Sequence, residues 1–383
     1  MQYRKFGKLE WKVSALGFGA MRLPLTSPDP ASVDEPEAIR MIRYAIDHGV
    51  NYLDTAYFYH LGQSERVVSR ALRDGYRERM KLATKMPVRI IESAADFDRY
   101  FNEQLERLQS DKVDFYLLHG LNGRSWVKVR DLGVLRWAED KMAKGRFDYL
   151  GFSFHDDYEA FKRIIDDYDN WMLSQVLYNY IDVDNQAGRR GVEYAASKQL
   201  AVVVMEPLRG GLLAREAPEK VAKVWENSPK NRSRVEWAFQ WVWNQPEISV
   251  ALSGMSTMQQ VVENCMSADR SGPGTLTPDE LVLIDRVREA YRGSSPIPCT
   301  SCGYCQPCPS GVDIPTIFQI YNESIIYNDP RRGRGRYRGP DGLKEEQRAD
   351  QCIECEECVE ACPQKISIPD WLKKAHALLG PRQ

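Results

Sequence analysis

The chain has 383 residues, of which 43% are hydrophobic and 28% are charged, which is ordinary for a globular protein with a sizeable core. The formal net charge of -2 argues against nucleic-acid binding, and the apolar runs, such as residues 201–205, are far too short to span a membrane. Residues 1–9 are polar and lack a secretory apolar region, so we expect a soluble, cytoplasmic protein.

Short β-branched or apolar runs alternate with amphipathic helical patterns along the chain. The runs predict strands at residues 15–19, 52–54, 80–84, 113–118, 149–152, 173–176, 201–204 and 248–252. The helical patterns cover residues 36–48, 64–72, 94–108, 134–144, 157–167, 191–198, 232–244 and 257–266. This alternation predicts an α/β fold, a (β/α)8 TIM barrel; a doubly wound open sheet is the competing architecture. The opening residues 4–13 predict a short hairpin at the bottom of the barrel.

A turn-rich segment at residues 292–298 separates these alternations from a cysteine-rich region. We therefore expect residues 1–292 to form the barrel and residues 293–383 to form a second domain. This second domain is expected to be mainly α-helical, with one helix at residues 314–327.

Polar residues follow three neighbouring strands, at the barrel edge where TIM barrels carry their chemistry. Strand 52–54 ends in Asp54, with Tyr59 five residues further on. Lys85 follows the next strand, and His119 follows the one after it. Each could be an ordinary strand-end residue, but four of them in this order favour one shared pocket.

These four side chains together suit the reduction of a carbonyl group. Tyr59 could give a proton to the carbonyl oxygen as hydride reaches the carbon, although a free tyrosine has a pKa of about 10. We expect the Lys85 ammonium to lower the pKa of Tyr59, and Asp54 to hold Lys85 in place. His119 would donate a hydrogen bond to the carbonyl and orient it.

Several segments resemble the aldo-keto reductase family over the first three quarters of the chain. They are K-V-S-A-L-G-F-G-A-M, D-T-A-Y-F-Y-H-L-G-Q-S-E, L-A-T-K-M-P, F-Y-L-L-H-G, G-F-S-F and Q-V-L-Y-N. The resemblance implies that Asp54, Tyr59, Lys85 and His119 are the catalytic tetrad of an NAD(P)(H)-dependent oxidoreductase. It also implies cofactor contacts at Gly19, Met21, Ser153, Gln175, Met205, Pro207, Leu208, Arg209, Ser253, Gly254, Ser256, Gln260, Glu263 and Asn264.

The sequence departs from this family's pattern at several cofactor positions. Phe154 replaces the usual asparagine after Ser153, and Met205 stands where an aromatic residue often stacks on nicotinamide. Gly254 and Gln260 occupy the positions where NADPH-dependent relatives carry Lys and Arg for the 2′-phosphate. A dianionic phosphate without a basic partner is poorly held, so NADH is favoured over NADPH, although Arg209 could still contact a phosphate.

Eight of the nine cysteines fall into two motifs near the end of the chain. They read C-T-S-C-G-Y-C-Q-P-C-P and C-I-E-C-E-E-C-V-E-A-C-P, a spacing typical of two [4Fe–4S] clusters. The last cysteine of each motif is expected to bind the other motif's cluster. This gives the predicted sets Cys299, Cys302, Cys305, Cys362 and Cys352, Cys355, Cys358, Cys308. Zinc is the alternative, but its C-x-x-C pairs are usually separated. The arrangement resembles an α-helical ferredoxin.

An arginine-rich segment at residues 331–340 lies between the two motifs. It is predicted to be a flexible loop, and its arginines could dock an acidic electron carrier such as ferredoxin, with Arg334 and Arg336 as the residues to test. An RNA-binding role has no other support in the chain, and the remaining cysteine, Cys265, is expected in the core.

Hydride transfer moves two electrons at once, whereas a [4Fe–4S] cluster moves one, so the two halves need a link. That link could be a flavoprotein partner or FMN bound in the barrel, or the clusters could be structural or redox-sensing. The leading interpretation is a carbonyl/alcohol oxidoreductase that uses nicotinamide and passes electrons through its clusters. The alternatives are a flavin- and iron–sulfur-dependent reductase, and a redox-sensing binding protein with a non-catalytic barrel.

Overall fold

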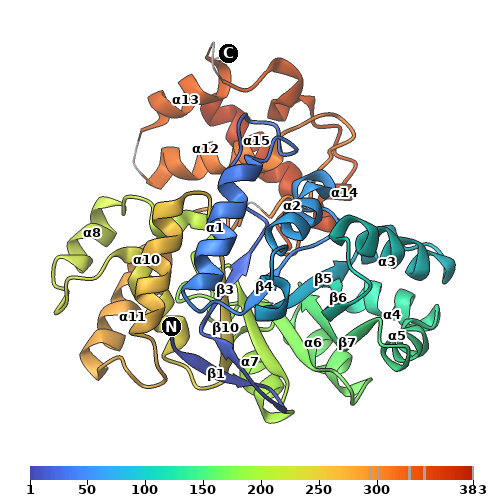
Figure 1. Cartoon of the computed structure of the whole chain (residues 1–383). Helices are drawn as coiled ribbons and strands as arrows, with labels where there is room; N and C mark the ends of the chain where they lie inside the picture. Colours follow the sequence, from blue (N-terminus) through green and yellow to red (C-terminus); the bar gives the residue numbers. More distant parts are fainter. Residues whose placement is uncertain (293–294, 301, 327–328, 340–341, 382–383) are drawn as a thin grey trace. The chain divides into compact units, whose positions relative to one another are not determined.

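The computed structural model describes residues 1–292, 295–300, 302–326, 329–339 and 342–381. Eight parallel strands close into a barrel in the order β10-β3-β4-β5-β6-β7-β8-β9 (Figure 1). The strands are β3 (Leu16–Gly19), β4 (Tyr52–Asp54), β5 (Lys81–Met86), β6 (Val113–Leu121), β7 (Phe147–Phe154), β8 (Leu173–Leu177), β9 (Ala201–Met205) and β10 (Ile248–Gly254). Because β10 pairs with β3, the predicted TIM barrel is confirmed and the open sheet is excluded.

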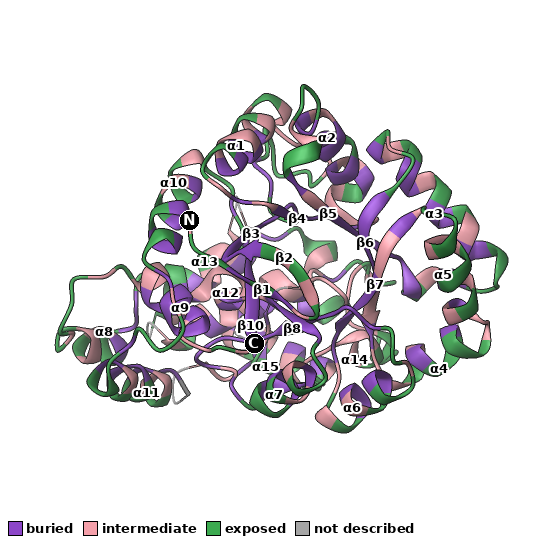
Figure 2. Ribbon diagram, turned by 60° about the horizontal axis from the view of Figure 1, so that its bottom comes forward, coloured by how far each residue is buried: buried purple, intermediate pink, exposed green. Residues whose placement is uncertain are grey.

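Helices follow the strands and cover the barrel. They are α1 (Glu35–Asp47), α2 (Gln63–Ala71), α3 (Ala95–Leu108), α4 (Gly123–Asp131), α5 (Val134–Ala143), α6 (Tyr158–Asp166), α7 (Gly188–Ser197), α9 (Arg234–Trp243) and α10 (Met258–Asp269). Of these, α4 was not predicted, and its N-terminus is fixed by a capping box between Asn122 and Ser125. In Figure 2 the strands are buried, and the outer faces of the surrounding helices are exposed.

Helix α1 illustrates how the sequence sets these elements. The Asp34 side chain accepts a hydrogen bond from the backbone N–H of Glu37, which satisfies a donor that the helix leaves unpaired. Met41, Ile42 and Ala45 recur at helical spacing and are fully buried. The helix therefore presents one apolar face to the barrel.

The predicted hairpin at the chain start is confirmed as β1 (Tyr3–Phe6) and β2 (Leu9–Ser14). Phe6 packs against Phe115, with ring centroids 5.0 Å apart, and against Trp11 at 5.4 Å. Tyr52 joins this aromatic group, which belongs to the hydrophobic core inside the barrel. The hairpin thus fills the barrel from the end opposite to the strands' C-terminal ends.

We expect Phe115→Ala to lower the free energy of unfolding by about 3–5 kcal/mol, because it removes a fully buried ring and leaves a cavity. Urea denaturation followed by circular dichroism would measure the change. As a control, Val127→Ala on α4 alters a side chain that is 37% exposed. This variant should lower the free energy of unfolding by less than about 0.5 kcal/mol. Equal costs for the two variants would contradict this account of the core.

By compactness the chain divides into two units, Met1–Pro207 with Ser233–Leu276, and Leu208–Arg232 with Thr277–Gln383. The second unit therefore includes residues that leave the barrel after β9 as well as the cysteine-rich region. The predicted domain boundary after residue 292 stays a prediction; residues 293 and 294 of the predicted linker lie outside the described residues.

The second unit is mainly helical. Its elements are η4 (Arg209–Ala214), α8 (Glu219–Trp225), α11 (Pro278–Arg292), α12 (Ile314–Ile326), α13 (Pro330–Arg338), η5 (Glu345–Gln347), η6 (Ala349–Gln351), α14 (Glu357–Ala361) and α15 (Ile368–Leu379). Helices α8 and α11 were not predicted. The predicted helix at 314–327 corresponds to α12, with residue 327 outside the described residues.

The prediction of a flexible arginine-rich loop is wrong, because residues 330–338 form α13. Asp329 caps this helix, Pro330 begins it, and the buried Tyr337 anchors it. The Tyr337 hydroxyl lies 3.0 Å from His376 Nδ1 and accepts a hydrogen bond from the Ala349 N–H at 2.8 Å. Residue 340 of the predicted loop lies outside the described residues.

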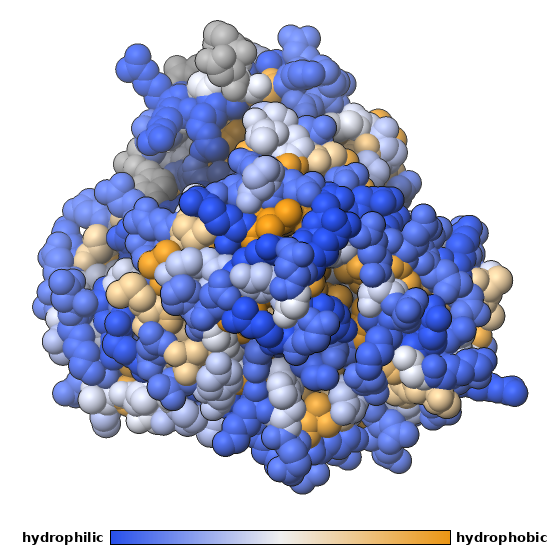
Figure 3. Space-filling model, viewed as in Figure 1, coloured by the Kyte–Doolittle hydropathy of each residue, from blue (hydrophilic) through white to orange (hydrophobic). Residues whose placement is uncertain are grey.

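Within the described ranges, we find no helix whose length and apolar content would let it cross a membrane. Hydrophilic residues cover most of the face drawn in Figure 3, and hydrophobic residues form separate patches.

Candidate active site and iron–sulfur ligands

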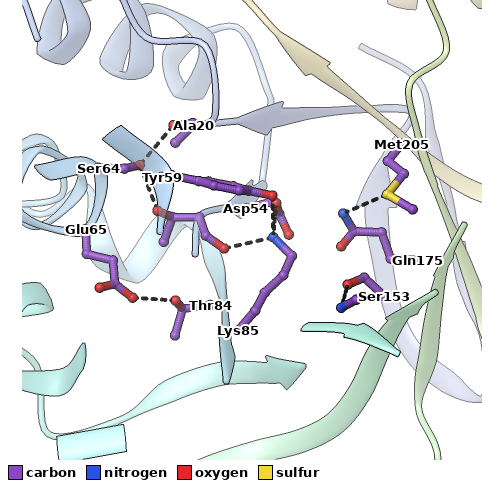
Figure 4. Close-up of polar contacts among 12 residues, drawn as sticks. Ala20, Asp54, Tyr59, Ser64, Glu65, Thr84, Lys85, Ser153, Gln175 and Met205 are labelled. Atoms are coloured by element: carbon purple, nitrogen blue, oxygen red, sulfur yellow. Dashed lines mark hydrogen bonds and ion pairs between the residues drawn. The ribbon is translucent and has the colours of Figure 1, made fainter. Parts of the chain in front are cut away.

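Three of the four predicted catalytic side chains are in direct contact at the C-terminal ends of β4 and β5. Lys85 Nζ donates hydrogen bonds to Asp54 Oδ1 at 2.5 Å, to the Thr55 carbonyl at 2.8 Å and to the Tyr59 hydroxyl at 3.3 Å. Figure 4 shows the three side chains converging, with Lys85 in the middle. Lys85 is fully buried and Asp54 is 2% exposed, so the ion pair is shielded from water.

The pKa of Tyr59 does not shift in the predicted direction. Burial raises it well above its ordinary value, and the nearby carboxylates of Asp54 and Glu206 raise it further. The predicted lowering by Lys85 is therefore wrong: desolvation of the phenolate dominates, and the Lys85 charge is already balanced by Asp54. Tyr59 is consequently a neutral phenol whose O–H can donate.

His119, the fourth predicted residue, lies beside Tyr59. The two rings meet edge to face, with centroids 5.8 Å apart. Burial lowers the pKa of His119 well below its ordinary value, and the neighbouring Lys85, His155 and Arg89 lower it further. Its imidazole is therefore neutral and suited to donate a hydrogen bond.

A second group of buried polar side chains supports this site and was not predicted. Glu65 is fully buried, and its carboxylate accepts hydrogen bonds from Thr84 Oγ1 at 2.6 Å and from Gln104 Nε2 at 2.7 Å. Gln104 Nε2 also donates to the Lys85 carbonyl at 3.0 Å, which fixes the backbone at the catalytic lysine. Glu65 is the last residue of the segment D-T-A-Y-F-Y-H-L-G-Q-S-E, and its place in that segment was a sequence signal for this network. The sequence alone does not show that its carboxylate is buried or which side chains it contacts.

Ser153, Gln175 and Met205 lie on three consecutive strands, on the other side of Lys85 in Figure 4. Ser153 Oγ accepts a hydrogen bond from the Gly120 N–H at 2.8 Å, so its own proton stays available. Gln175 Nε2 contacts Met205 Sδ at 3.9 Å. Gln175 Oε1 is buried and has no hydrogen-bond partner among the described residues, so it can accept one from a ligand.

The predicted residues from Ser253 onward lie at the end of β10 and in the loop and helix α10 that follow it, next to the end of β3. Gly254 pairs with Gly19 in the barrel. Ser256 N–H donates to Gln260 Oε1 at 2.8 Å, and Asn264 Nδ2 donates to Ser253 Oγ at 3.1 Å. Glu263 is exposed and accepts a hydrogen bond from Gln259 at 2.8 Å.

Arg22 lies beside this loop and was not predicted. Its aliphatic stem packs over Gly254, where an added Cβ would lie 3.2 Å from Arg22 Cβ. Ser256 Oγ also donates to the Arg22 carbonyl at 2.8 Å. A side chain at position 254 would require the exposed Arg22 stem to shift by a few tenths of an ångström.

The remaining predicted cofactor contacts are spread over both compact units. Met21 is 41% exposed and precedes Arg22. Pro207 is buried, and it is the last residue of the first of the two segments that make up the first unit. Leu208 and Arg209 belong to the second unit, where Arg209 is 8% exposed.

Three further charged or titratable groups surround the catalytic side chains. His155 follows β7, is buried with a pKa lowered to about 4, and has Nδ1 3.3 Å from Gln186 Oε1. Arg89 lies over the Phe58 ring, with its guanidinium carbon 5.0 Å from the centroid. Glu206 has a left-handed backbone with φ of 55°, a conformation that costs energy for a non-glycine residue and is concentrated at functional sites.

The motif cysteines that influence one another electrostatically fall into two sets of four. The pKa of Cys305 is raised by burial and then by the neighbouring Cys302, Cys299 and Cys362. The pKa of Cys358 is raised to about 11 by burial and then by Cys352, Cys308 and Cys355. These are the two sets that the crossover spacing predicts, and four thiols in each set suit a [4Fe–4S] cluster.

The cysteines stand at the edge of a hydrophobic core in the second unit. None of the nine cysteines, all in the described ranges, forms a disulfide. Six of the motif cysteines pack against a core that contains Ile297, Val312 and Phe318; these six are Cys299, Cys305, Cys308, Cys352, Cys358 and Cys362. Among the described residues, no His, Cys, Asp or Glu side chains form a group of three arranged for a single metal ion.

The sequence matches the aldo/keto reductase family over residues 15–288 and a 4Fe–4S dicluster domain over residues 298–366. Since the first match covers more than half of the chain, the protein belongs to the aldo/keto reductase family. It is an oxidoreductase that carries an iron–sulfur domain at its C-terminal end.

Similar proteins agree with this assignment. The oxidoreductase YrpG of Bacillus subtilis is 24% identical, over 73% of this chain and 99% of its own, and L-galactose dehydrogenase of Arabidopsis thaliana is 26% identical, over 69% and 87%. Aldo-keto reductase AKR11C1 from Bacillus halodurans, in its holo form, superposes with a TM-score of 0.61 at 27% identity, over 75% of this chain and 96% of that one. An aldo-keto reductase from Klebsiella pneumoniae in complex with NADPH gives a TM-score of 0.57 at 25% identity, over 75% and 95%.

Proposed function

We propose that the barrel interconverts a small carbonyl compound and its alcohol with a nicotinamide cofactor. The contact of Lys85 Nζ with both Asp54 and the Tyr59 hydroxyl carries this proposal. The nicotinamide, when bound, supplies or accepts the hydride. Tyr59 then gives its phenolic proton to the carbonyl oxygen, while Lys85 stabilises the negative charge that develops on the phenol oxygen.

The other side chains orient the reactants. The neutral His119 imidazole is suited to donate a hydrogen bond to the carbonyl oxygen. The unpaired acceptor of Gln175 and the hydroxyl of Ser153 fit the carboxamide group of a nicotinamide. The NADPH complex of the related Klebsiella pneumoniae protein supports the same cofactor class here.

Carbonyl reduction should show a flat pH profile over the neutral range. Tyr59 loses its proton only as the pH rises through a pKa raised above the ordinary value of 10.0, and His119 becomes charged only as the pH falls through a pKa lowered below 6.5. We therefore expect kcat/KM to vary less than about threefold between about pH 6.5 and about pH 9.5. A rise or fall of kcat/KM with an apparent pKa of about 7 to 9 would contradict the assigned charge states of Tyr59 and His119.

We further propose that NADH binds more tightly than NADPH, because Gly254 and Gln260 supply no charge for a 2′-phosphate. Fluorescence titration should give a Kd for NADH about tenfold or more below that for NADPH, and Arg22→Leu should change both values little. Tighter NADPH binding that is lost in Arg22→Leu would overturn this preference and assign the phosphate contact to Arg22.

The two cysteine sets are proposed to hold two [4Fe–4S] clusters, each of which exchanges one electron at a time. Because hydride carries two electrons, an external one-electron carrier or flavoprotein is part of this proposal. A cytoplasmic location, where thiols stay reduced, would suit eight free cysteines. FMN in the barrel is the alternative link, and flavin bands in the spectrum of the anaerobically purified protein would support it.

A further inference from the structure

One motif cysteine is exposed, and its surroundings form a distinct surface. Cys355 lies in an exposed stretch that we call the Cys355 face, made up of Ile353, Glu354, Cys355, Glu356 and Glu357. Ile353 is 68% exposed and stands directly between Cys352 and the acidic residues that flank Cys355. The other motif cysteines are partly buried.

The Cys355 face is strongly acidic. Three of its five residues, Glu354, Glu356 and Glu357, are acidic and none is basic, so its formal charge is -3. Lys373 pairs with Glu354 at 2.7 Å. The structure shows no ion pair for Glu356 or Glu357 within the described ranges, so an approaching partner meets their charge directly.

The backbone does not explain the acidic residues beside Cys355. Glu354 and Glu356 have φ values of 57° and 63°, in the left-handed region that glycine and asparagine adopt at lower cost. Glycine at these positions would ease the turn around Cys355. At position 356 glutamate keeps a strained backbone and adds a charge that no ion pair among the described residues uses, which points to a role for this charge outside the fold.

The arginines of α13 form a weaker candidate for the same role. Arg336 is ion-paired with Glu323, and Arg334 Nε donates to the Leu378 carbonyl at 3.1 Å, so the two residues first suggested for docking hold the helix in place. Arg331, Arg332 and Arg338 are exposed, but no cysteine lies on α13.

We infer that the Cys355 face is the docking surface for a one-electron carrier protein whose own redox centre is surrounded by lysines or arginines. This inference rests on the proposed cluster ligation by Cys355. Ile353 would supply the apolar centre of a small interface, and Glu356 and Glu357 would supply its charged rim. A cluster held by the Cys355 set would supply or accept one electron, and the carrier would accept or supply it.

Cytochrome c, a basic haem carrier, tests this inference when its binding to the cluster-loaded full chain is measured by titration calorimetry. Glu356→Gln/Glu357→Gln should weaken binding about threefold to tenfold at ~20 mM salt and less than about twofold at ~300 mM salt, because salt screens exposed charges. Ile353→Ser should weaken it at both salt concentrations. The control Arg331→Gln/Arg332→Gln should leave the affinity unchanged or slightly higher.

Two results would overturn the inference. One is unchanged cytochrome c affinity in the Glu356/Glu357 and Ile353 variants. The other is tight binding of an acidic [2Fe–2S] ferredoxin that is lost in the Arg331/Arg332 variant, which would place docking on α13. Iron content measured on the same samples separates these outcomes from a failure of the cluster proposal, which would show as wild-type protein without iron.

Discussion

Replacing Tyr59 by phenylalanine is expected to lower kcat for carbonyl reduction by about 10²–10⁴-fold, the usual contribution of a positioned general acid. The substitution removes only the hydroxyl that Lys85 Nζ contacts at 3.3 Å and leaves the ring beside His119. The Kd of the nicotinamide should stay within about twofold, because the loss concerns proton donation. Single-turnover kinetics under anaerobic conditions would separate the two effects.

Tyr57→Phe is the matched control for this experiment. The Tyr57 hydroxyl bonds Glu103 Oε2 at 2.8 Å instead of Lys85, so its removal is the same chemical change two residues away. This variant should keep kcat within about threefold. Full activity in Tyr59→Phe would show that the proton comes from another group.

Loss of single cysteines is expected to halve the iron content of the purified chain, from about eight to about four atoms. Cys305→Ser and Cys358→Ser should each remove one cluster and leave the other, because they belong to different sets. Iron and sulfide assays with the visible absorbance would measure this. Cys265→Ser, at a buried cysteine outside both motifs, should keep the full content.

Double variants test the crossover between the motifs. Cys305→Ser/Cys362→Ser alters two ligands of one proposed set, so about four iron atoms should remain. Cys358→Ser/Cys362→Ser alters two cysteines of one motif that belong to different sets, so almost no iron should remain. The reverse pattern would mean that each motif binds its own cluster, and zinc in place of iron would end the cluster proposal.

The barrel and the meeting of Asp54, Tyr59 and Lys85 were predictable because both follow from order along the chain. Strand–helix alternation fixes the barrel, and residues just after neighbouring parallel strands, such as Lys85 and His119, must lie at one mouth. The two cysteine sets stay a prediction, which rests on short fixed spacings that limit which thiols can meet.

What depends on burial or on loop conformation could not be predicted. The direction of the Tyr59 pKa shift depends on how completely the pocket excludes water, which the sequence does not state. Helix α13 contains Gly333 and Gly335, which disfavour a helix, and it forms because Tyr337 is buried in the second unit. Arg22 follows the predicted Met21, and Glu206 lies between the predicted Met205 and Pro207, but the groups that their side chains approach depend on loop conformation.

The central claim is that hydride passes directly between nicotinamide and a carbonyl carbon in the barrel. Its most direct test is an anaerobic turnover of the cluster-loaded protein with NADH or NADPH that carries deuterium at both C4 positions, and with a panel of small aldehydes and ketones. We predict deuterium on the carbinol carbon of the alcohol product, detected by mass spectrometry. An alcohol formed without deuterium, or oxidation of the cofactor that only reduces the clusters, would contradict the claim.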